Sequence, residues 1–322
     1  MEKTENLEIN NEDLNAQISA QIQEQLAKAR EEKRDVEKEE KHDRTKKIII
    51  KTITYILLTF GALTCIFPFY WMIMSSFKTI REYEAFVPTY WPHEWTTEAY
   101  TLAFKYNNGM FTQTLVNSLI VGFTSTFASV VLTILAAYAF ARIDFKGKNL
   151  VFSLCMMTMM VPGELFTITN YVTMNTLKWK DTYTALIVPF LCSIYYIYLL
   201  RNSFKSIPES LYKAAKVDGC SDIKYLVKIM IPLSGPTIIS ITILKLIGTW
   251  NSYIWPQLVN KQSMQLVSNW MSNCGINSDR TEFTDYPMRM AASIIISIPL
   301  FIVFILFRKY IMRGVSKSGI KG

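Results

Sequence analysis

Long apolar runs alternate with polar segments along this chain. Half of the residues are hydrophobic, and they gather in runs of about 20 residues, the length that crosses a hydrocarbon core about 30 Å thick. The core of a single soluble protein would not bury so many runs, which disfavours a soluble helical protein. The pattern therefore predicts an all-α membrane protein with six transmembrane helices, at 53–74, 115–139, 150–169, 183–200, 237–259 and 290–307.

A polar segment at 206–236, between the fourth and fifth runs, carries the signals of ordered helices. Its sequence is SIPESLYKAAKVDGCSDIKYLVKIMIPLSGP. Ser206 and Glu209 have the S-x-x-E spacing of a capping box, and Pro208 falls in the first turn, where no N–H donor is needed. We therefore predict that a helix starts here.

The rest of the segment predicts a turn and a second helix. Gly219 suits the left-handed end of the first helix, because glycine has no Cβ to oppose that conformation. The second helix is expected to begin near Ser221 and to stop at Pro232. Ala214 and Ala215 leave a surface with little side chain, which another protein can approach closely. The segment is predicted to be a hairpin of two helices that docks on a cytosolic partner.

Basic residues favour one side of the predicted membrane. With a cytosolic N-terminus, the three inner segments carry fourteen Lys and Arg, and the three outer segments carry seven. This bias is typical of cytosolic loops, so both termini are predicted to be cytosolic. The net charge of +8 then indicates attraction to anionic lipid rather than to nucleic acid. The inner segments are 142–148, 201–236 and 308–322, and the outer ones are 78–112, 173–182 and 260–287.

The first 47 residues differ in composition from the rest of the chain. They contain no Gly, Pro, Cys or aromatic residue, and they carry thirteen acidic and ten basic residues. We predict a cytosolic polar tail at 1–47, either disordered or helical, followed by a six-helix transmembrane domain at 48–322. A coiled coil that binds a partner is the alternative, because Ile18, Ile22 and Leu26 have helical spacing.

Few residues in this chain suit catalysis or metal binding. The five cysteines form no C-x-x-C pair, and the two histidines are His42 and His93. We therefore expect no metal site and no disulfide framework. The sequence also lacks the G-x(4)-G-K-[ST] loop that holds the phosphates of a nucleotide. The chain is predicted to be neither an enzyme nor a cofactor-binding protein.

The fifth predicted span holds candidates for contact with a transported solute. Lys245 lies deep inside the span, where a charge is costly. It is expected to line a translocation path, to pair with an acidic residue of a partner membrane protein, or to snorkel or pack at the interface between them. An amide and three aromatic residues follow, which suit a sugar ring but also form the aromatic belt of a membrane surface. These residues are Trp250, Asn251, Tyr253 and Trp255.

The hairpin segment resembles a known signature. Its residue spacing is similar to the EAA motif of ABC-importer permeases, E-A-A-x(3)-G-x(9)-I-x-L-P. In that family the loop lies in a cleft of a separate ATPase subunit, so the resemblance implies a coupling role for the matched residues. Lys213 departs from the motif by reversing the charge of the first Glu, and Ile231 replaces Leu. The positions concerned are Lys213, Ala214, Ala215, Asp218, Gly219, Ile229, Ile231 and Pro232.

Further blocks, from about Lys51 to Gly322, resemble sugar-type permeases of the maltose-importer kind. They occur in the order of that family, and they imply its type I ABC importer transmembrane fold. The blocks include Trp91-Pro92, Trp95-Thr96, Asn117-Ser118, Ala136-Ala137-Tyr138-Ala139, Ala141-Arg142, Val161-Pro162-Gly163-Glu164, Asp181-Thr182-Tyr183, Leu199-Leu200-Arg201, Trp250-Asn251, Arg313-Gly314 and Lys321-Gly322.

The resemblance also implies a function and a set of partners. The chain is expected to be a permease subunit of an ATP-driven, binding-protein-dependent importer of sugars or oligosaccharides in the cell membrane. Its expected partners are a second homologous permease, ATPase subunits that bind the ATP, and an outer-face sugar-binding protein. The outer segment 260–287 can face that binding protein.

Two other functions stand as alternatives. An ion-coupled secondary transporter is expected to have several carboxylates near the membrane midplane, or half-helix breaks in two repeats. The sequence shows neither feature. A membrane scaffold or signalling protein that uses the tail would leave the hairpin unexplained.

Overall fold

The computed structural model describes residues 28, 33, 42, 44–276 and 284–319, except for the side chains of Gln262 and residues 310–319. Within these ranges the chain is helical, and its one isolated β-bridge joins Ile276 and Thr284. The predicted all-α fold is therefore confirmed. Most of the predicted tail at 1–47 lies outside the described residues, as do Lys321 and Gly322.

Within the described part of the chain, three helices are each long and apolar enough to cross a membrane. They are Arg44–Ser76, α4 (Phe111–Arg142) and the stretch Tyr286–Lys309 of α15 (Tyr286–Gly319). Each is longer than the apolar run that predicted it, because polar residues at its ends continue the same helix. The chain divides into two compact units, Met1–Tyr70 and Trp71–Gly322, and the helices below belong to the second.

The third and fourth predicted spans are bent pairs of helices. α5 (Lys148–Thr158) meets the stretch formed by η1 (Gly163–Leu165) and α6 (Phe166–Thr176) at 81°. The stretch of α7 (Tyr183–Ile187) and η2 (Val188–Phe190) meets α8 (Ile194–Lys205) at 47°.

A proline explains the first interruption. Pro162 lies in that break, and a proline has no N–H to continue the helical bonds. The second break comes after η2, which contains Pro189. Each of these two predicted spans is therefore a pair of helices and not a single one. With each bent pair counted as one span, the described residues contain up to six spans, in agreement with the predicted number.

The fifth span departs furthest from its prediction. α10 (Asp222–Tyr225), a π-helical turn η3 (Leu226–Met230) and α11 (Ile231–Leu233) form one stretch, which meets α12 (Gly235–Trp250) at 81°. The predicted stop at Pro232 is wrong, because the helix continues through this residue and breaks at Ser234. The wider π turn comes just before Pro232, whose ring would clash with a carbonyl in a regular helix. The predicted outer part of the span forms a separate helix, α13 (Ile254–Val259).

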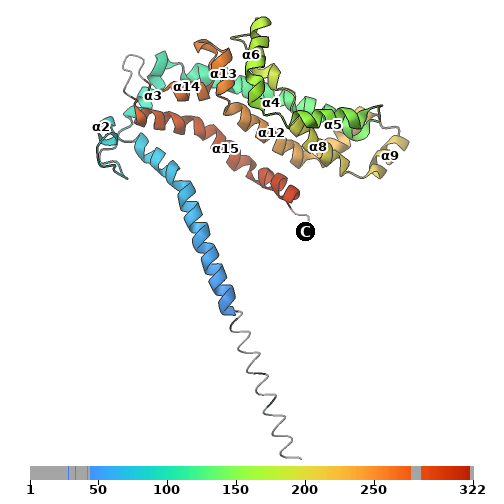
Figure 1. Cartoon of the computed structure of the whole chain (residues 1–322), viewed down its shortest axis with the longest axis horizontal. Coiled ribbons are helices and arrows are strands. Elements are labelled where there is room, and N and C mark those ends of the chain that lie inside the picture. Colours follow the sequence, from blue (N-terminus) through green and yellow to red (C-terminus); the bar gives the residue numbers. More distant parts are fainter. Residues whose placement is uncertain (1–27, 29–32, 34–41, 43, 277–283, 320–322) are drawn as a thin grey trace, which may run out of the picture. The chain divides into compact units, whose positions relative to one another are not determined.

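Helix α4 is the common partner of α8, α12 and α14 (Val267–Asn273), and α15 contacts α12, α14 and α3 (Glu98–Gly109) (Figure 1). Most buried residues of α4 are small, which lets helices approach closely in a membrane. A Cβ added at Gly122 would lie 3.4 Å from Cδ1 of Leu246 on α12. The remaining short elements are α2 (Ile80–Tyr83), α9 (Glu209–Val217) and η4 (Gln262–Met264).

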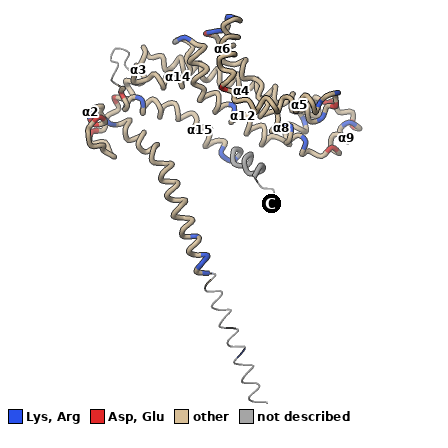
Figure 2. Tube along the Cα trace, viewed as in Figure 1, with Lys and Arg blue, Asp and Glu red and all other residues tan. Residues whose placement is uncertain are grey.

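Charged side chains gather toward opposite ends of this unit (Figure 2). Acidic residues lie around α2, and basic residues gather where α4 ends, α5 begins and α9 lies. The end that carries α9 is therefore the basic end of the unit. Its Lys and Arg include Arg142, Lys146, Lys148, Arg201, Lys205, Lys213 and Lys216.

Candidate functional site

The hairpin 206–236 contains a glycine turn between two helices. Gly219 follows α9 with a φ of 71°. Its N–H donates to the carbonyl of Lys216 at 3.1 Å, and the N–H of Cys220 donates to the carbonyl of Ala215 at 2.9 Å. These bonds satisfy the last carbonyls of α9, and they require a left-handed residue after the cap. The predicted glycine turn is confirmed. So is the second helix start, because Ser221 caps α10.

The start of α9 differs from the prediction. Ser206 ends α8, and its hydroxyl donates to the carbonyl of Ser203 at 2.7 Å. Pro208 is the N-cap residue of α9, and no side chain caps this helix. Glu209 instead pairs with Nζ of Lys213 at 3.2 Å. The predicted capping box is wrong because α8 extends further than its apolar run and takes up Ser206.

Asp222 joins the hairpin to α4. Its Oδ1 accepts hydrogen bonds from the hydroxyls of Tyr138 on α4 and Tyr212 on α9, at 2.8 and 2.9 Å. Its Oδ2 pairs with Nζ of Lys216 on α9 at 3.0 Å. The bond from Lys216, followed by those from the two tyrosines, lowers the pKa of Asp222. The resulting stabilisation is complete above the ordinary pKa of aspartate and is lost as the pH falls below the lowered value.

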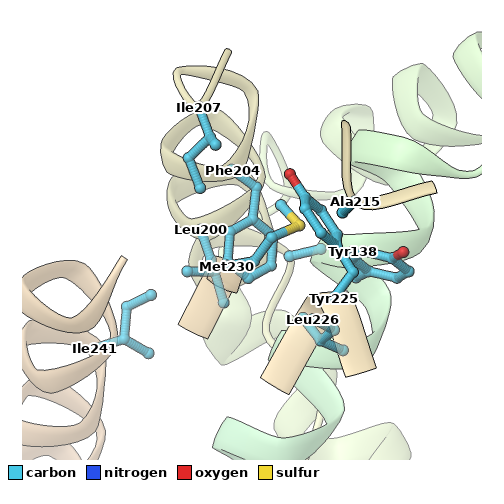
Figure 3. Packing of buried hydrophobic residues seen from close by; sticks show 10 residues of the cluster. Tyr138, Leu200, Phe204, Ile207, Ala215, Tyr225, Leu226, Met230 and Ile241 are labelled. Carbon is cyan, nitrogen blue, oxygen red and sulfur yellow. The ribbon is translucent and has the colours of Figure 1, made fainter. Parts of the chain in front are cut away.

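Tyr138, one partner of Asp222, also belongs to a hydrophobic core (Figure 3). Phe204 of α8, Tyr225 of α10 and Met230 of the π turn are fully buried. The rings of Tyr212 and Tyr225 meet edge to face, with their centroids 5.0 Å apart. Full burial of one large apolar side chain contributes about 1.5–3 kcal/mol. The hairpin is therefore packed against α4 and α8 and does not form a loose loop.

Two arginines connect the ends of α4 and α8. Arg142, at the end of α4, donates to the carbonyls of Phe204 and Ile207 at 3.2 and 2.6 Å. In return, Nε of Arg201 on α8 donates to the carbonyl of Phe140 at 3.1 Å. The last carbonyls of a helix have no partner within the helix, and cations are favourable there. These bonds fix the two helices to each other next to the hairpin.

The outward face of the hairpin is partly apolar. Val217 at the end of α9 is 87% exposed, and Ile223 on α10 is 76% exposed. Ala214 is exposed as predicted, whereas Ala215 is buried against the core, so only one of the two alanines reaches the surface. The other predicted coupling residues divide in the same way: Lys213, Asp218, Gly219 and Pro232 are exposed, and Ile229 packs against the core.

The sequence patterns did not identify the residue that joins the hairpin to α4 or the apolar residues of its exposed face. Asp222 was one of several acidic residues in a polar segment, and its two tyrosine partners come from different helices. Val217 and Ile223 did carry a signal, because large apolar residues stand among charged ones at the tip of a hairpin. Large exposed apolar side chains on an ordered hairpin suit contact with another protein.

Two of the predicted substrate-path residues line one cavity. Lys245 of α12 and Trp255 of α13 face a space of about 460 Å³, together with Ser125 of α4 and Tyr196 of α8. Nζ of Lys245 donates to the carbonyl of Phe190 at 2.8 Å. Nε1 of Trp255 donates to the carbonyl of Ala185 at 2.9 Å.

Two further predicted substrate-path residues line an adjoining cavity of about 490 Å³. Asn251 and Tyr253 line it with Glu164, beside the kink of the third span. Phe190, Ser252 and Trp255 line both cavities, so the two spaces share a wall.

Trp250 lines neither of these two cavities; with Asn251 and Tyr253 it lines another, of about 390 Å³, against α14 and α15. It is buried, and its Nε1 donates to the carbonyl of Ile296 on α15 at 3.2 Å. It packs in a separate cluster with Trp270 and Met288. Helix α12 ends at Trp250, so Asn251, Tyr253 and Trp255 lie beyond this helix, although the predicted span ran to residue 259.

Part of the outer segment 260–287 is a packed helix. Residues 267–273 form α14, where Val267, Ser268, Asn269 and Trp270 are buried. The polar residues Asn277 and Asp279 of this segment lie outside the described residues.

Comparisons with known proteins identify relatives over most of the chain. Residues 129–317, more than half of the chain, match the family described as binding-protein-dependent transport system inner membrane component. A probable ABC transporter permease protein of Mycoplasma genitalium is 32% identical, covering 87% of this chain and 92% of the relative. The polygalacturonan/rhamnogalacturonan transport system permease protein YtcP of Bacillus subtilis is 30% identical, covering 84% and 97%. The arabinooligosaccharides transport system permease protein AraQ of the same species is 28% identical, covering 85% and 96%.

A solved structure shares the fold. It is described as a bacterial ABC transporter involved in the import of the acidic polysaccharide alginate, and one of its chains matches with a TM-score of 0.71 at 22% identity. The match covers 81% of this chain and 96% of that chain. None of these comparisons supports an ion-coupled secondary transporter. This chain belongs to the family of binding-protein-dependent transport system inner membrane components, and it is a multi-pass permease subunit of an ABC transporter.

Proposed function

We propose that this permease forms half of the translocation path of an importer for saccharides and couples that path to a separate ATPase. The relatives named above are described as permeases for arabinooligosaccharides and for polygalacturonan or rhamnogalacturonan. The paired cavities beside α12 support a path for such solutes. They combine apolar and aromatic walls with hydroxyl, amide and charged groups, as sites for small polar ligands commonly do.

The bonding of Asp222 is the observation that carries the coupling role. A hairpin that transmits the closure of an ATPase must move together with the membrane helices. Asp222 links α9 and α10 to Tyr138 on α4, and the buried core fixes the same elements. Displacement of the hairpin therefore displaces α4, which is the kind of two-state packing change that drives conformational switching.

The ATPase contact is assigned to the exposed face of the hairpin. It consists of the predicted coupling residues Lys213, Ala214, Asp218, Gly219 and Pro232, with Val217 and Ile223 added. Ala215 and Ile229 support this face from within. ATP hydrolysis is assigned to the partner subunit, because this chain has no phosphate-binding loop.

The basic end of the permease is assigned to the cytosol. Lys and Arg gather around α9 and the adjoining helix ends (Figure 2), as the positive-inside rule expects. Both termini and the tail at 1–47 then face the cytosol, and the transmembrane domain is 48–322.

Two further partners complete the proposal. A second, homologous permease supplies the other half of the path. An outer-face binding protein delivers the saccharide; one of the matched solved structures is described as an alginate ABC transporter in complex with an alginate pentasaccharide-bound periplasmic protein. In this chain, α15 contacts both α14 and α3 (Figure 1).

Purification of the tagged chain from its native membrane in mild detergent tests the assembly. We expect a second permease and an ATPase subunit to copurify, and we expect a saccharide with its binding protein to stimulate ATP hydrolysis. A Val217→Ser, Ile223→Ser double variant should retain the second permease and lose the ATPase. Recovery of the wild-type chain alone would contradict the proposed importer.

A further inference from the structure

The cavity beside α12 contains a positive charge without a negative partner. Lys245 lines this cavity, and none of its described lining residues is acidic. The ion pairs of the described residues do not include Lys245 either. An ammonium group has three N–H donors, and the bond to the carbonyl of Phe190 uses one of them.

The break between η2 and α8 explains why the lysine stays at the cavity. Phe190 is the last residue of η2, so its carbonyl lies at a helix end and lacks a regular helical donor. The bond from Nζ of Lys245 supplies that donor at 2.8 Å. It also holds the ammonium at the cavity wall, whereas a free lysine would extend toward a membrane surface.

A buried hydroxyl in the same cavity is also available for a ligand. Ser125 on α4 is 1% exposed, and its Oγ has no hydrogen-bond partner among the described residues. Buried polar groups are rarely left without a partner in a folded protein. Ser193 and Tyr196 add two further hydroxyls to the lining.

We propose that this cavity receives an anionic group of the transported saccharide, such as the carboxylate of a uronic acid, and that Lys245 selects for it. The inference rests on the proposed saccharide importer and names the class of saccharide. A carboxylate accepts charge-assisted hydrogen bonds from an ammonium and neutral ones from hydroxyls. Glu164 in the adjoining cavity disfavours a second anion there, so that space suits the neutral hydroxyls of the sugar.

A native cysteine allows the charge preference of the cavity to be measured without knowing the sugar. Cys192 is an exposed free thiol that lines the same cavity. In the purified transporter complex, its rate of modification is measured by mass spectrometry with two methanethiosulfonates. One carries an anionic sulfonate and the other a cationic trimethylammonium group.

The expected result is a preference for the anionic reagent that depends on Lys245. Lys245→Met should lower the anion-to-cation rate ratio at least about fivefold, because a nearby unit charge acts on the two reagents with opposite sign. Lys245→Arg should retain the ratio, and Lys261→Met, which changes an exposed lysine outside the cavity, should leave it unchanged. An equal ratio in wild type and Lys245→Met, or no reaction of Cys192 with either reagent, would overturn the proposal.

Transport of two matched sugars links the cavity to the substrate. The complex is reconstituted with its binding protein, and uptake of α-1,4-linked trigalacturonate is compared with that of α-1,4-linked galactotriose. We expect wild type to prefer the acidic trimer and Lys245→Met to lose most of that preference. If wild type prefers the neutral trimer, the proposed selection of an anionic saccharide is overturned, while the proposed importer function stands. Failure of both sugars to stimulate the ATPase or to be transported would count against the saccharide importer, while the Cys192 measurement still decides the charge preference of the cavity.

Discussion

The hairpin end and the cavity differ in how many hydrogen-bond partners their key polar groups have. At the hairpin, the Asp222 carboxylate has three partners, and the adjoining helix ends are bonded by Arg142 and Arg201. At the cavity, helices are broken, and the buried Ser125 hydroxyl has no partner among the described residues. At the hairpin, the Tyr225 hydroxyl and Nε of Arg142 also lack a partner among the described residues, but neither residue lines the cavity, whereas Ser125 does. A packed and bonded network makes a region rigid, and an unbonded polar group that faces a cavity favours a ligand. The comparison indicates that one end transmits motion and the other receives a solute.

Helix α4 extends through both regions. It presents Tyr138 to Asp222 at the hairpin and Ser125 to the cavity. The two residues are thirteen positions apart on one uninterrupted helix, which corresponds to about 20 Å along its axis. A shift imposed on Tyr138 therefore reaches the cavity through a continuous element.

Substitution of Gly219 in the hairpin should have the largest effect of the variants below. Gly219→Val forces a β-branched residue to adopt a φ of 71°, and a left-handed conformation costs most residues about 1–2 kcal/mol or more. The space around a Cβ is open, so the damage comes from the backbone alone. We expect substrate uptake to fall more than about tenfold.

The matched variant for this prediction is Gly219→Asn, because asparagine tolerates the left-handed conformation. It should retain most of the uptake, and surface labelling should find both variants in the membrane in similar amounts. Normal uptake by Gly219→Val would show that the turn geometry is not required for coupling.

Removal of the Asp222 carboxylate should have the second-largest effect. Asp222→Ala leaves two tyrosine hydroxyls and Lys216 without this acceptor. The carboxylate is 48% exposed, so each lost hydrogen bond should cost only about 0.5–1.5 kcal/mol. We expect a lower melting temperature of the purified complex and ATP hydrolysis that is less dependent on substrate. Tyr138→Phe removes one of the bonds and should show the same change to a smaller extent. An unchanged ratio of stimulated to basal hydrolysis in Asp222→Ala would contradict the coupling role.

Polar substitution of the exposed hairpin face should have a smaller, specific effect. Val217→Ser removes an apolar side chain that is 87% exposed, so the free energy of unfolding of the permease should change by less than about 0.5 kcal/mol. The affinity for the ATPase subunit, measured by titration in detergent, should fall several-fold. Val87→Ser, at a residue that is 71% exposed outside the hairpin, serves as the control. An equal loss of ATPase affinity in the two variants would contradict the assignment of the hairpin face as the ATPase contact.

Removal of a cavity hydroxyl should have the smallest effect. Ser125→Ala deletes an unpartnered oxygen, so the stability of the permease should not decrease, while KM for uptake should rise by about two- to fivefold through loss of one hydrogen bond. Ser129→Ala deletes another unpartnered buried hydroxyl on α4 that does not line the cavity. It should leave KM unchanged, and a parallel rise in both variants would mean that α4 packing, not solute contact, is affected.

Local sequence signals predicted the helices and the glycine turn. The apolar runs identified the membrane character and up to six spans, and Gly219 identified the end of α9, because backbone conformation at such a position depends on the residue itself. Local sequence signals gave wrong helix boundaries where a neighbouring helix or turn changed the environment of the residue. Ser206 was taken up by α8 instead of capping α9, and Pro232 was accommodated after a π turn instead of ending the helix.

The sequence alone determined the membrane class and the position of the hairpin, because both depend on composition, periodicity and local spacing, and its motifs carried the resemblance to the permease family. The tertiary structure alone decided which side chains meet. It brought Tyr138 to Asp222 across 84 positions of sequence, and it placed Lys245 and Ser125 in one cavity while directing Trp250 toward α15. The physical reason is that helix breaks and helix–helix packing set the direction of each side chain, and both arise from contacts between residues far apart in the chain.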